Sequence, residues 1–167
     1  MLLRERAWDI MRADYVTVRA SDSLRDVADR LREAMKNLED HSGRACAVVL
    51  SEDGGFRGVV TAWWLLLSLA KYARKDALKP GQTPGDEEKF TTAIRKVFSR
   101  RVDETIERDV PVVRPEDSLS KVLDAMLATK RRWAVVMEGD SVLGIISGED
   151  IFMQLDWDEL EEERLRI

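Results

Sequence analysis

The stretch DYVTVRASDSLRDVADRL, residues 14–31, returns later in the chain as DVPVVRPEDSLSKVLDAM, residues 109–126. The two stretches share Asp, Val, Arg, Asp, Ser, Leu, Val and Asp at positions that lie 95 residues apart. Two more blocks follow in the same order: AVVL at 47–50 matches AVVM at 134–137, and GVVT at 58–61 matches GIIS at 144–147. Three blocks that recur in one order indicate a tandem duplication.

Each copy shows the same order of predicted strands and helices. A short β-branched strand (16–19 or 112–114) leads to Asp22 or Asp117, which is placed to accept from the first amides of a helix. Apolar residues then recur at helical spacing, over 23–40 in the first copy, so one face of that helix is predicted to be buried. Two apolar runs around a Gly/Asp turn indicate a hairpin, and a second helix closes the copy.

The segment between the copies differs from both. Residues 75–88 contain two prolines, two glycines and several charges, which is typical of a solvated linker, and residues 89–102 then show helical spacing. We predict a first repeat over 1–74, a linker with a helix over 75–100, and a second repeat over 101–167.

Composition limits the class of protein. Apolar residues make up 44 % of the chain and charged residues 35 %, with a net charge of −5 and a pI near 5.1, which argues against nucleic acid as a partner. The single cysteine suits a reducing compartment, and the longest apolar run, 62–70, is far below the roughly 20 residues of a membrane span. We expect a cytoplasmic protein without a membrane partner. The absence of a Cys–His pair, a metal-ligand cluster and a P-loop predicts that it is not an enzyme and holds no metal.

The segment GIISGEDI, residues 144–151, is the candidate binding corner. Ser147 and Asp150 lie three apart at a predicted helix start and share one face, where first-turn amides favour an anion. Ser147 can bond a ribose or phosphate oxygen, Asp150 can accept from two ribose hydroxyls, and Gly148 lets a ligand approach the backbone. The alternative interpretation is that Ser147 only caps the helix and that the two acids only complement its dipole.

The doubled strand–helix–hairpin–helix unit resembles the CBS domain pair, or Bateman module. The resemblance rests on VTVRASDSL and VPVVRPEDSL, on the AVV strands, and on GIISGED against the pattern Gly–apolar–apolar–Ser/Thr–x–x–Asp. It implies an α/β (α+β) fold in which two β-α-β-β-α units pack about a pseudo-twofold axis. It also implies a regulatory module that binds AMP, ADP, ATP or S-adenosylmethionine between the repeats, with no cofactor expected beyond such an adenine nucleotide.

The same resemblance implies further ligand contacts around Asp150. Main chain near Tyr15 and Val16 would meet the adenine, and Ile145 belongs to the motif strand. Basic residues before the hairpins would meet phosphates. They are Arg131 and Arg132 in KRRW and Arg44, beside His41, in HSGRA. Each of these cations has the alternative interpretation of a solvated loop residue.

The first copy departs from the family pattern, because GVVTAWW has Trp64 where the acid belongs. The second cleft, with Thr61, Trp64, Val110 and Pro111, is therefore expected to be degenerate and not equivalent to the first. Trp64 can stack on a base or block the cleft, and its alternative role is in the core or in an oligomer contact.

Two functions stay open from the sequence. The first is a nucleotide-sensing module that signals to a partner protein in trans. The second is a ligand-free dimerisation or protein-interaction module. In either case the apolar residues of the closing helices favour a homodimer. They are Trp63, Trp64, Leu67, Phe152 and Trp157.

Overall fold

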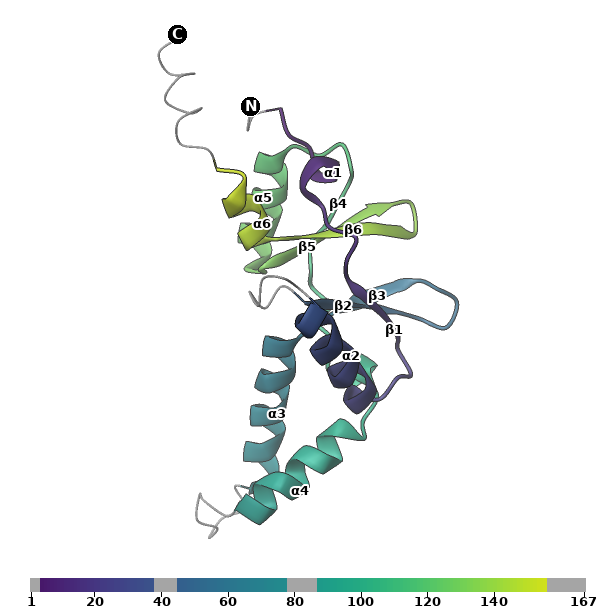
Figure 1. Ribbon diagram of the computed structural model, residues 1–167, viewed down its shortest axis with the longest axis vertical. Coiled ribbons are helices and arrows are strands. Elements are labelled where there is room, and N and C mark those ends of the chain that lie inside the picture. The colour runs from purple at the N-terminus through teal and green to yellow at the C-terminus, as the bar shows by residue number, and fades with distance from the viewer. Residues whose placement is uncertain (1–3, 38–44, 78–86, 156–167) are drawn as a thin grey trace. The chain divides into compact units, whose positions relative to one another are not determined.

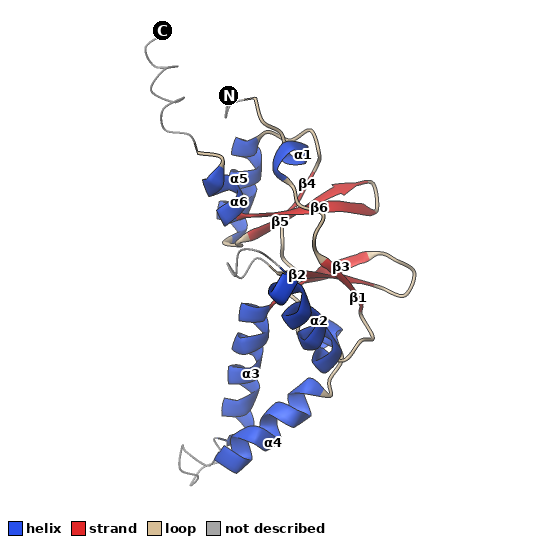
Figure 2. Cartoon of the chain, viewed as in Figure 1, coloured by secondary structure: helices blue, strands red, loops and turns tan. Residues whose placement is uncertain are grey.

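The computed structural model describes residues 4–37, 45–77 and 87–155. These residues form an α+β fold with two separate three-stranded sheets (Figure 1), and Figure 2 shows helices gathered beside each sheet. The predicted fold class is thereby confirmed. The chain divides into two compact units, residues 16–108 and residues 1–15 with 109–167, and each is described by itself.

The unit of residues 16–108 holds the first sheet, in the order β1-β2-β3. Strands β1 and β2 are parallel, and β2 and β3 form an antiparallel hairpin. Residues 46–49 of β2 are all buried, as its unbroken apolar sequence predicts. The elements are β1 (Val16–Arg19), α2 (Leu24–Asn37), β2 (Cys46–Leu50), β3 (Phe56–Thr61), α3 (Ala62–Ala77), α4 (Glu87–Phe98) and a 3₁₀ turn (Val102–Glu104).

The core of this unit lies between the sheet and α2. Leu24, Val27 and Leu31 recur on one face of α2 and are almost completely buried. Helix α4, from the segment between the two repeats, packs against α3 and α2 and buries Val97. The predicted helix after the linker is therefore present, and it covers the first repeat.

The second unit repeats this arrangement. Its sheet has the order β4-β5-β6, with β4 parallel to β5 and β5 antiparallel to β6. The predicted strand over 112–114 is one residue shorter than expected. The elements are α1 (Ala7–Ile10), β4 (Val112–Val113), α5 (Leu119–Thr129), β5 (Trp133–Glu138), β6 (Ser141–Ser147) and α6 (Gly148–Met153).

The segment before each repeat packs on the sheet of the other repeat. Ala7 N donates to Asp117 O at 2.8 Å, and 95 positions later Val102 N donates to Asp22 O at the same distance. Ala7 and Val102 are both completely buried in their cores. The duplication therefore includes residues 5–12 and 100–107, and these two segments are exchanged between the two sequence repeats, so that each packs within the unit of the other repeat's sheet.

Each exchanged segment also pairs with the edge strand of its sheet. Arg12 and Ile145 exchange two backbone hydrogen bonds, at 2.8 and 3.0 Å, and Glu107 and Val59 do the same at 2.9 and 3.1 Å. The edges of β6 and β3 are thus partly covered, which removes exposed peptide groups from them.

The glycine of the repeated Gly–apolar–apolar motif makes this pairing possible. Gly58 has φ +156°, and a Cβ built on it would lie 2.5 Å from Glu107 O. A Cβ on Gly144 would lie 3.0 Å from Arg12 O. The glycine therefore admits the exchanged backbone, a role for which its small size is required.

The prediction that Asp22 and Asp117 cap the helices is wrong by one residue, because the following serines are the caps. Ser118 is the N-cap of α5 and its side chain accepts from Lys121 N, whereas the Asp117 carboxylate accepts from Arg114 N in the preceding turn. Ser23 and Asp22 divide the two roles in the same way. The serine hydroxyl reaches the free amides because the serine directly precedes the helix.

Parts of the predicted organisation lie outside the described residues. Helix α2 is described to Asn37, so residues 38–40 of the predicted helix lie outside, and so does 78–86 of the linker. The repeat boundaries 1–74, 75–100 and 101–167 stay a prediction. Within the described ranges, every helix is too short or too polar to cross a bilayer.

Candidate functional site

The β6–α6 corner holds the two polar residues that the sequence singled out. Ser147 and Asp150 are buried, and only 6 % of Asp150 is exposed. Ser147 Oγ accepts from Asp150 N at 3.1 Å, while Asp150 Oδ2 accepts from Ser147 N at 2.8 Å and from Ser147 Oγ at 2.7 Å. This reciprocal capping box satisfies first-turn amides, so the structural role weighed in the sequence analysis is present.

Arg12 brings a positive charge to this corner. Its Nε lies 3.1 Å from both carboxylate oxygens of Asp150, and its Nη1 lies 2.9 Å from Asp14 Oδ1. The Arg12 side chain is 18 % exposed, and its backbone is fixed by the bonds to Ile145 on β6. A buried carboxylate with a guanidinium partner is far less costly than either charge alone.

Sequence reasoning missed Arg12. The residue lies outside the GIISGED motif and precedes the first repeated stretch. Residues 5–12 and 100–107 have only Arg6 and Arg101 in common, so the sequence carries no clear signal that Arg12 belongs to the duplicated unit or which sheet it joins.

Three other predicted residues share the unit with Asp150. A Cβ on Gly148 would meet only Met126 Cε, at 4.0 Å, so there is room at the first turn of α6. Ile145 uses its N–H and C=O to pair with Arg12. Tyr15 donates its hydroxyl to Val142 O at 3.3 Å, and partial burial raises the pKa of the Tyr15 phenol.

The predicted cations are placed as follows. Arg131, which is partly buried, lies 3.3 Å from Asp109 Oδ2, and Arg132, which is exposed, lies 2.8 Å from Glu149 Oε1. Both arginines directly precede β5, in the same unit as Asp150. Arg44 lies outside the described residues. Their contacts with a ligand stay a prediction.

The β3–α3 corner of the first repeat keeps the helix-capping hydroxyl of Thr61 but has Trp64 in place of the aspartate. Thr61 Oγ1 accepts from Trp64 N at 3.2 Å, as Ser147 does from residue 150. The Trp64 indole Nε1–H donates to Thr105 O in the exchanged segment, so the indole nitrogen bonds its own unit. Val16 belongs to the unit with Trp64, whereas Val110 and Pro111 belong to the other unit. The roles predicted for these three residues stay predictions.

The charge at the exchanged segment is reversed between the units. Glu107 occupies the position that matches Arg12, and it is buried, with 7 % exposed. One corner thus combines an acid on the helix with a base on the segment, and the other combines a tryptophan with an acid. The two corners are chemically different.

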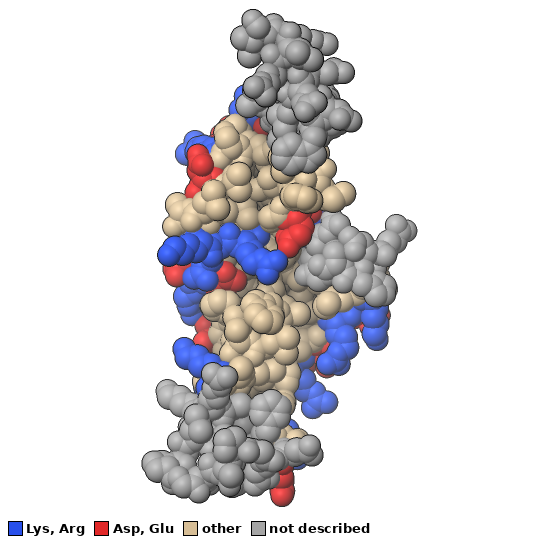
Figure 3. Space-filling view, turned by 90° about the vertical axis from the view of Figure 1, so that its left-hand side faces the viewer, with Lys and Arg blue, Asp and Glu red and all other residues tan. Residues whose placement is uncertain are grey.

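Metal ligation has no support in the part of the chain that the structure describes, since no three His, Cys, Asp or Glu side chains gather there. On the face seen in Figure 3, blue and red side chains lie close to one another around uncharged surface.

Comparison with protein families identifies the repeated unit. The model of the CBS domain matches the chain twice, at residues 7–63 and 102–156. The chain belongs to the CBS domain family. The resemblance seen in the sequence is confirmed, and each CBS match includes one of the two hairpins. Tandem CBS domains are generally regulatory, ligand-binding modules and not catalysts.

Solved CBS structures share the fold. A hexameric CBS-CP12 protein from bloom-forming cyanobacteria is 25 % identical with a TM-score of 0.64, covering 93 % of this chain and 73 % of that one. The cytosolic domain of the Mg²⁺ channel MgtE in complex with ATP is 21 % identical with a TM-score of 0.61, covering 91 % and 49 %. An uncharacterized conserved protein from Pyrococcus horikoshii is 16 % identical with a TM-score of 0.60, covering 93 % and 98 %. No curated protein matches the chain.

Proposed function

We propose that this tandem CBS protein is a cytoplasmic, non-catalytic regulator that binds an adenosine-containing ligand at the Ser147–Asp150 corner and signals to another protein. The observation that carries the proposal is the buried Asp150 carboxylate with Arg12 against it. The complex of the related MgtE domain with ATP supports the ligand class.

At this site a bound ribose would compete with the Arg12 guanidinium for the Asp150 carboxylate. A ribose offers two neighbouring hydroxyl donors, which can replace the guanidinium at the Asp150 carboxylate. Displacement leaves Arg12 beside the ligand, where it can pair with a phosphate bidentately. A nucleotide suits this exchange because it combines a neutral diol for the acid with an anion for the base.

Arg131 and Arg132 supply further positive charge in the same unit. The Arg132–Glu149 pair is exposed on both sides, and an exposed ion pair contributes about 0–1 kcal/mol. A phosphate can therefore replace Glu149 at small cost, while the partly buried Arg131 adds its charge nearby. Because Arg12, Arg131 and Arg132 can all attract phosphate, we expect AMP, ADP and ATP to bind better than S-adenosylmethionine, which has no phosphate.

The link to a partner runs through the exchanged segment. Arg12 is paired by backbone to β6 and lies two residues after α1, whose Ala7 and Ile10 belong to the core of the unit. If the ligand binds only after Arg12 has left Asp150, binding favours a conformation in which the segment of residues 5–12 has changed. The regulated protein would recognise that difference.

Isothermal titration calorimetry with AMP, ATP and S-adenosylmethionine tests the proposal. We expect binding of a nucleotide, weakened about tenfold or more in Asp150→Asn, because a charge-assisted bond contributes about 1.5–3 kcal/mol. Asp124→Asn, at an exposed acid of α5, is the matched control and should bind like wild type. No heat with any of the three ligands, or equal affinity in both variants, would contradict the proposal.

A ligand-free dimerisation module is the second candidate. It is favoured by the capping box and Arg12, which satisfy Asp150 within its own unit, and by the Trp64 corner, which lacks the acid. A stable dimer without any nucleotide binding would support this candidate.

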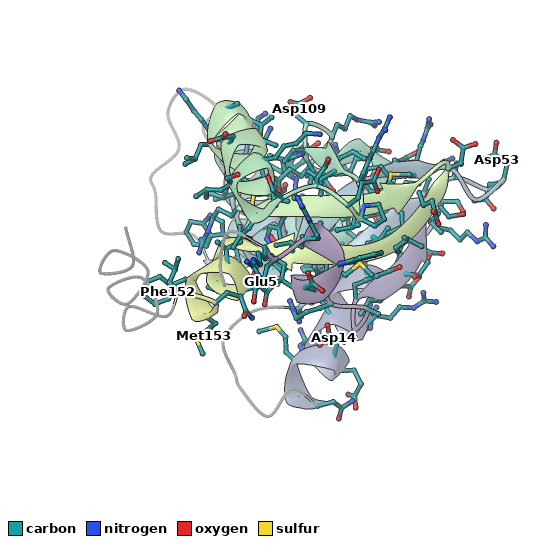
Figure 4. The ribbon with its side chains drawn as sticks, turned by 90° about the horizontal axis from the view of Figure 1, so that it is seen from above. Glu5, Asp14, Asp53, Asp109, Phe152 and Met153 are labelled. Carbon is teal, nitrogen blue, oxygen red and sulfur yellow. The ribbon has the colours of Figure 1, made fainter. Side chains whose placement is uncertain are left out.

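Self-association is part of both candidates. Trp63, Leu66 and Leu67 of α3 are exposed, with 61 % of Trp63 accessible, and Phe152 and Met153 project away from α6 (Figure 4). We propose that a second copy of the chain covers such helical surface. Trp157, also predicted to contribute, lies outside the described residues.

A further inference from the structure

A surface cavity of about 460 Å³ lies between α2 and α4, wholly inside the unit of residues 16–108. Its floor is apolar, formed by the partly exposed side chains of Ala28, Ile94 and Phe98. Helix α4 lies in the segment between the two family matches, so one wall of this cavity is outside the matched ranges.

The rim of the cavity is positively charged. Arg25 and Arg32 come from α2 and Arg95 from α4, and all three are exposed. Among the lining residues the acid is Asp29, which pairs with Arg32 at 3.2 Å. A positive groove on a chain of net charge −5 is unexpected from composition and favours an anionic occupant.

The spacing of the arginines indicates the size of that occupant. Arg25 and Arg32 are seven residues apart on α2, which corresponds to about 10 Å along the helix. Side chains two or four residues apart on an extended peptide share one face and lie about 7 or 13 Å apart. Acidic side chains at such a spacing can meet arginines along the rim, and an apolar side chain between them on the same face can reach the floor.

We propose that the α2–α4 groove docks an acidic segment of a partner protein, with one apolar side chain of that segment on the floor. Guanidinium groups match carboxylates bidentately, and Arg is enriched at protein interfaces. The groove shares no residue with the Ser147–Asp150 corner, so this docking stands independently of nucleotide binding.

Fluorescence anisotropy with the full chain and a fluorescein-labelled peptide, EDEFEDE, tests the docking. We expect saturable binding that weakens about tenfold or more in the double variant Arg25→Glu, Arg95→Glu and weakens with added salt. The peptides EDEAEDE and QNQFQNQ, which lack the anchor and the charges respectively, should bind more weakly than EDEFEDE.

The matched control is Arg57→Glu, the same charge reversal at an exposed residue of β3 outside the groove, which should change affinity less than about twofold. If the double reversal lowers the melting temperature strongly, Arg25→Gln with Arg95→Gln replaces it and should still weaken binding. Equal binding by the groove variants, or equal loss in Arg57→Glu, would overturn the proposal. Displacement of the peptide by equimolar citrate, or tighter binding of a single-stranded oligonucleotide, would overturn it too.

Discussion

Arg12 and Glu107 occupy matching positions and make the same backbone bonds to an edge strand, yet they carry opposite charges. Arg12 faces the Asp150 carboxylate, whereas the helix beside Glu107 carries Trp64 at the corresponding place. The scaffold is therefore conserved between the two copies of the unit while the chemistry of the corner is not. The nucleotide site proposed at Asp150 therefore has no chemical counterpart at Trp64.

Substitutions at two glycines can distinguish a role in ligand binding, assigned to Gly148, from a role in the fold, assigned to Gly58. Gly148→Ala should leave the free energy of unfolding unchanged or raise it by about 0.4–1 kcal/mol, because the new Cβ meets only Met126 Cε at 4.0 Å. Nucleotide affinity should fall, because the methyl group stands where the ligand approaches. Urea unfolding and calorimetry measure the two effects.

Gly58→Ala is the contrasting substitution. Its Cβ would lie 2.5 Å from Glu107 O at a φ of +156°, so the free energy of unfolding should fall by more than about 1 kcal/mol. Equal stability of the two alanine variants would contradict the role assigned to the motif glycine in admitting the exchanged segment.

At the scale of elements, the sequence predicts what is periodic and local. The β-branched runs, the Gly/Asp turns and the apolar stripe of α2 each specify their structure by side-chain spacing, and all are found. The exchange of 5–12 and 100–107 could not be predicted, because α1 has only four residues and its partner sheet is remote in sequence. Burial of Ala7 and Val102 is decided by tertiary packing.

The ionisation of Asp117, just before α5, makes the stability of the fold depend on pH. Burial opposes its ionisation, but the hydrogen bonds from Lys121 Nζ at 2.6 Å and Arg114 N at 2.8 Å outweigh this effect and lower the pKa of Asp117. The ionised carboxylate therefore stabilises the fold above the ordinary Asp pKa of about 3.9, and this contribution is lost as the pH falls through the lower folded pKa.

Asp117→Asn should lower the free energy of unfolding at pH 7 by about 1–3 kcal/mol, from the loss of charge-assisted hydrogen bonds. The difference from wild type should shrink as the pH falls below about 4. Denaturant titrations across pH measure this, with Glu116→Gln at an exposed neighbour as the control. A difference that grows at low pH would show that the carboxylate is not the stabilising group.

At the scale of the whole molecule, the location of the candidate site could be predicted and its composition only in part. Ser147 and Asp150 follow a motif within four residues, and their capping geometry follows from that spacing. Arg12 comes from a segment 138 residues away from Asp150 in the chain, so only the fold brings it to the carboxylate. The contact that Trp64 makes likewise could not be read from the sequence, because its indole donates to Thr105 O, 41 residues further along the chain.

Self-association is the prediction at this scale. Leu66→Glu with Trp63→Glu should convert a dimer to a monomer in sedimentation velocity, because charges cannot be buried in an apolar interface without partners. Trp8→Glu, at an exposed residue of α1, is the control and should leave the assembly unchanged. A wild-type monomer at high concentration would contradict the proposed dimer.

The central claim is that a nucleotide replaces Arg12 at Asp150 and leaves the Trp64 corner unoccupied. Nitrogen-15 NMR of side-chain N–H groups during titration with AMP or ATP tests it most directly. We expect the Arg12 Nε–H resonance to shift with ligand concentration, while the Trp64 indole Nε1–H resonance, held by Thr105 O, stays in place. An unchanged Arg12 resonance at saturating nucleotide, or a shift of Trp64 alone, would contradict the account.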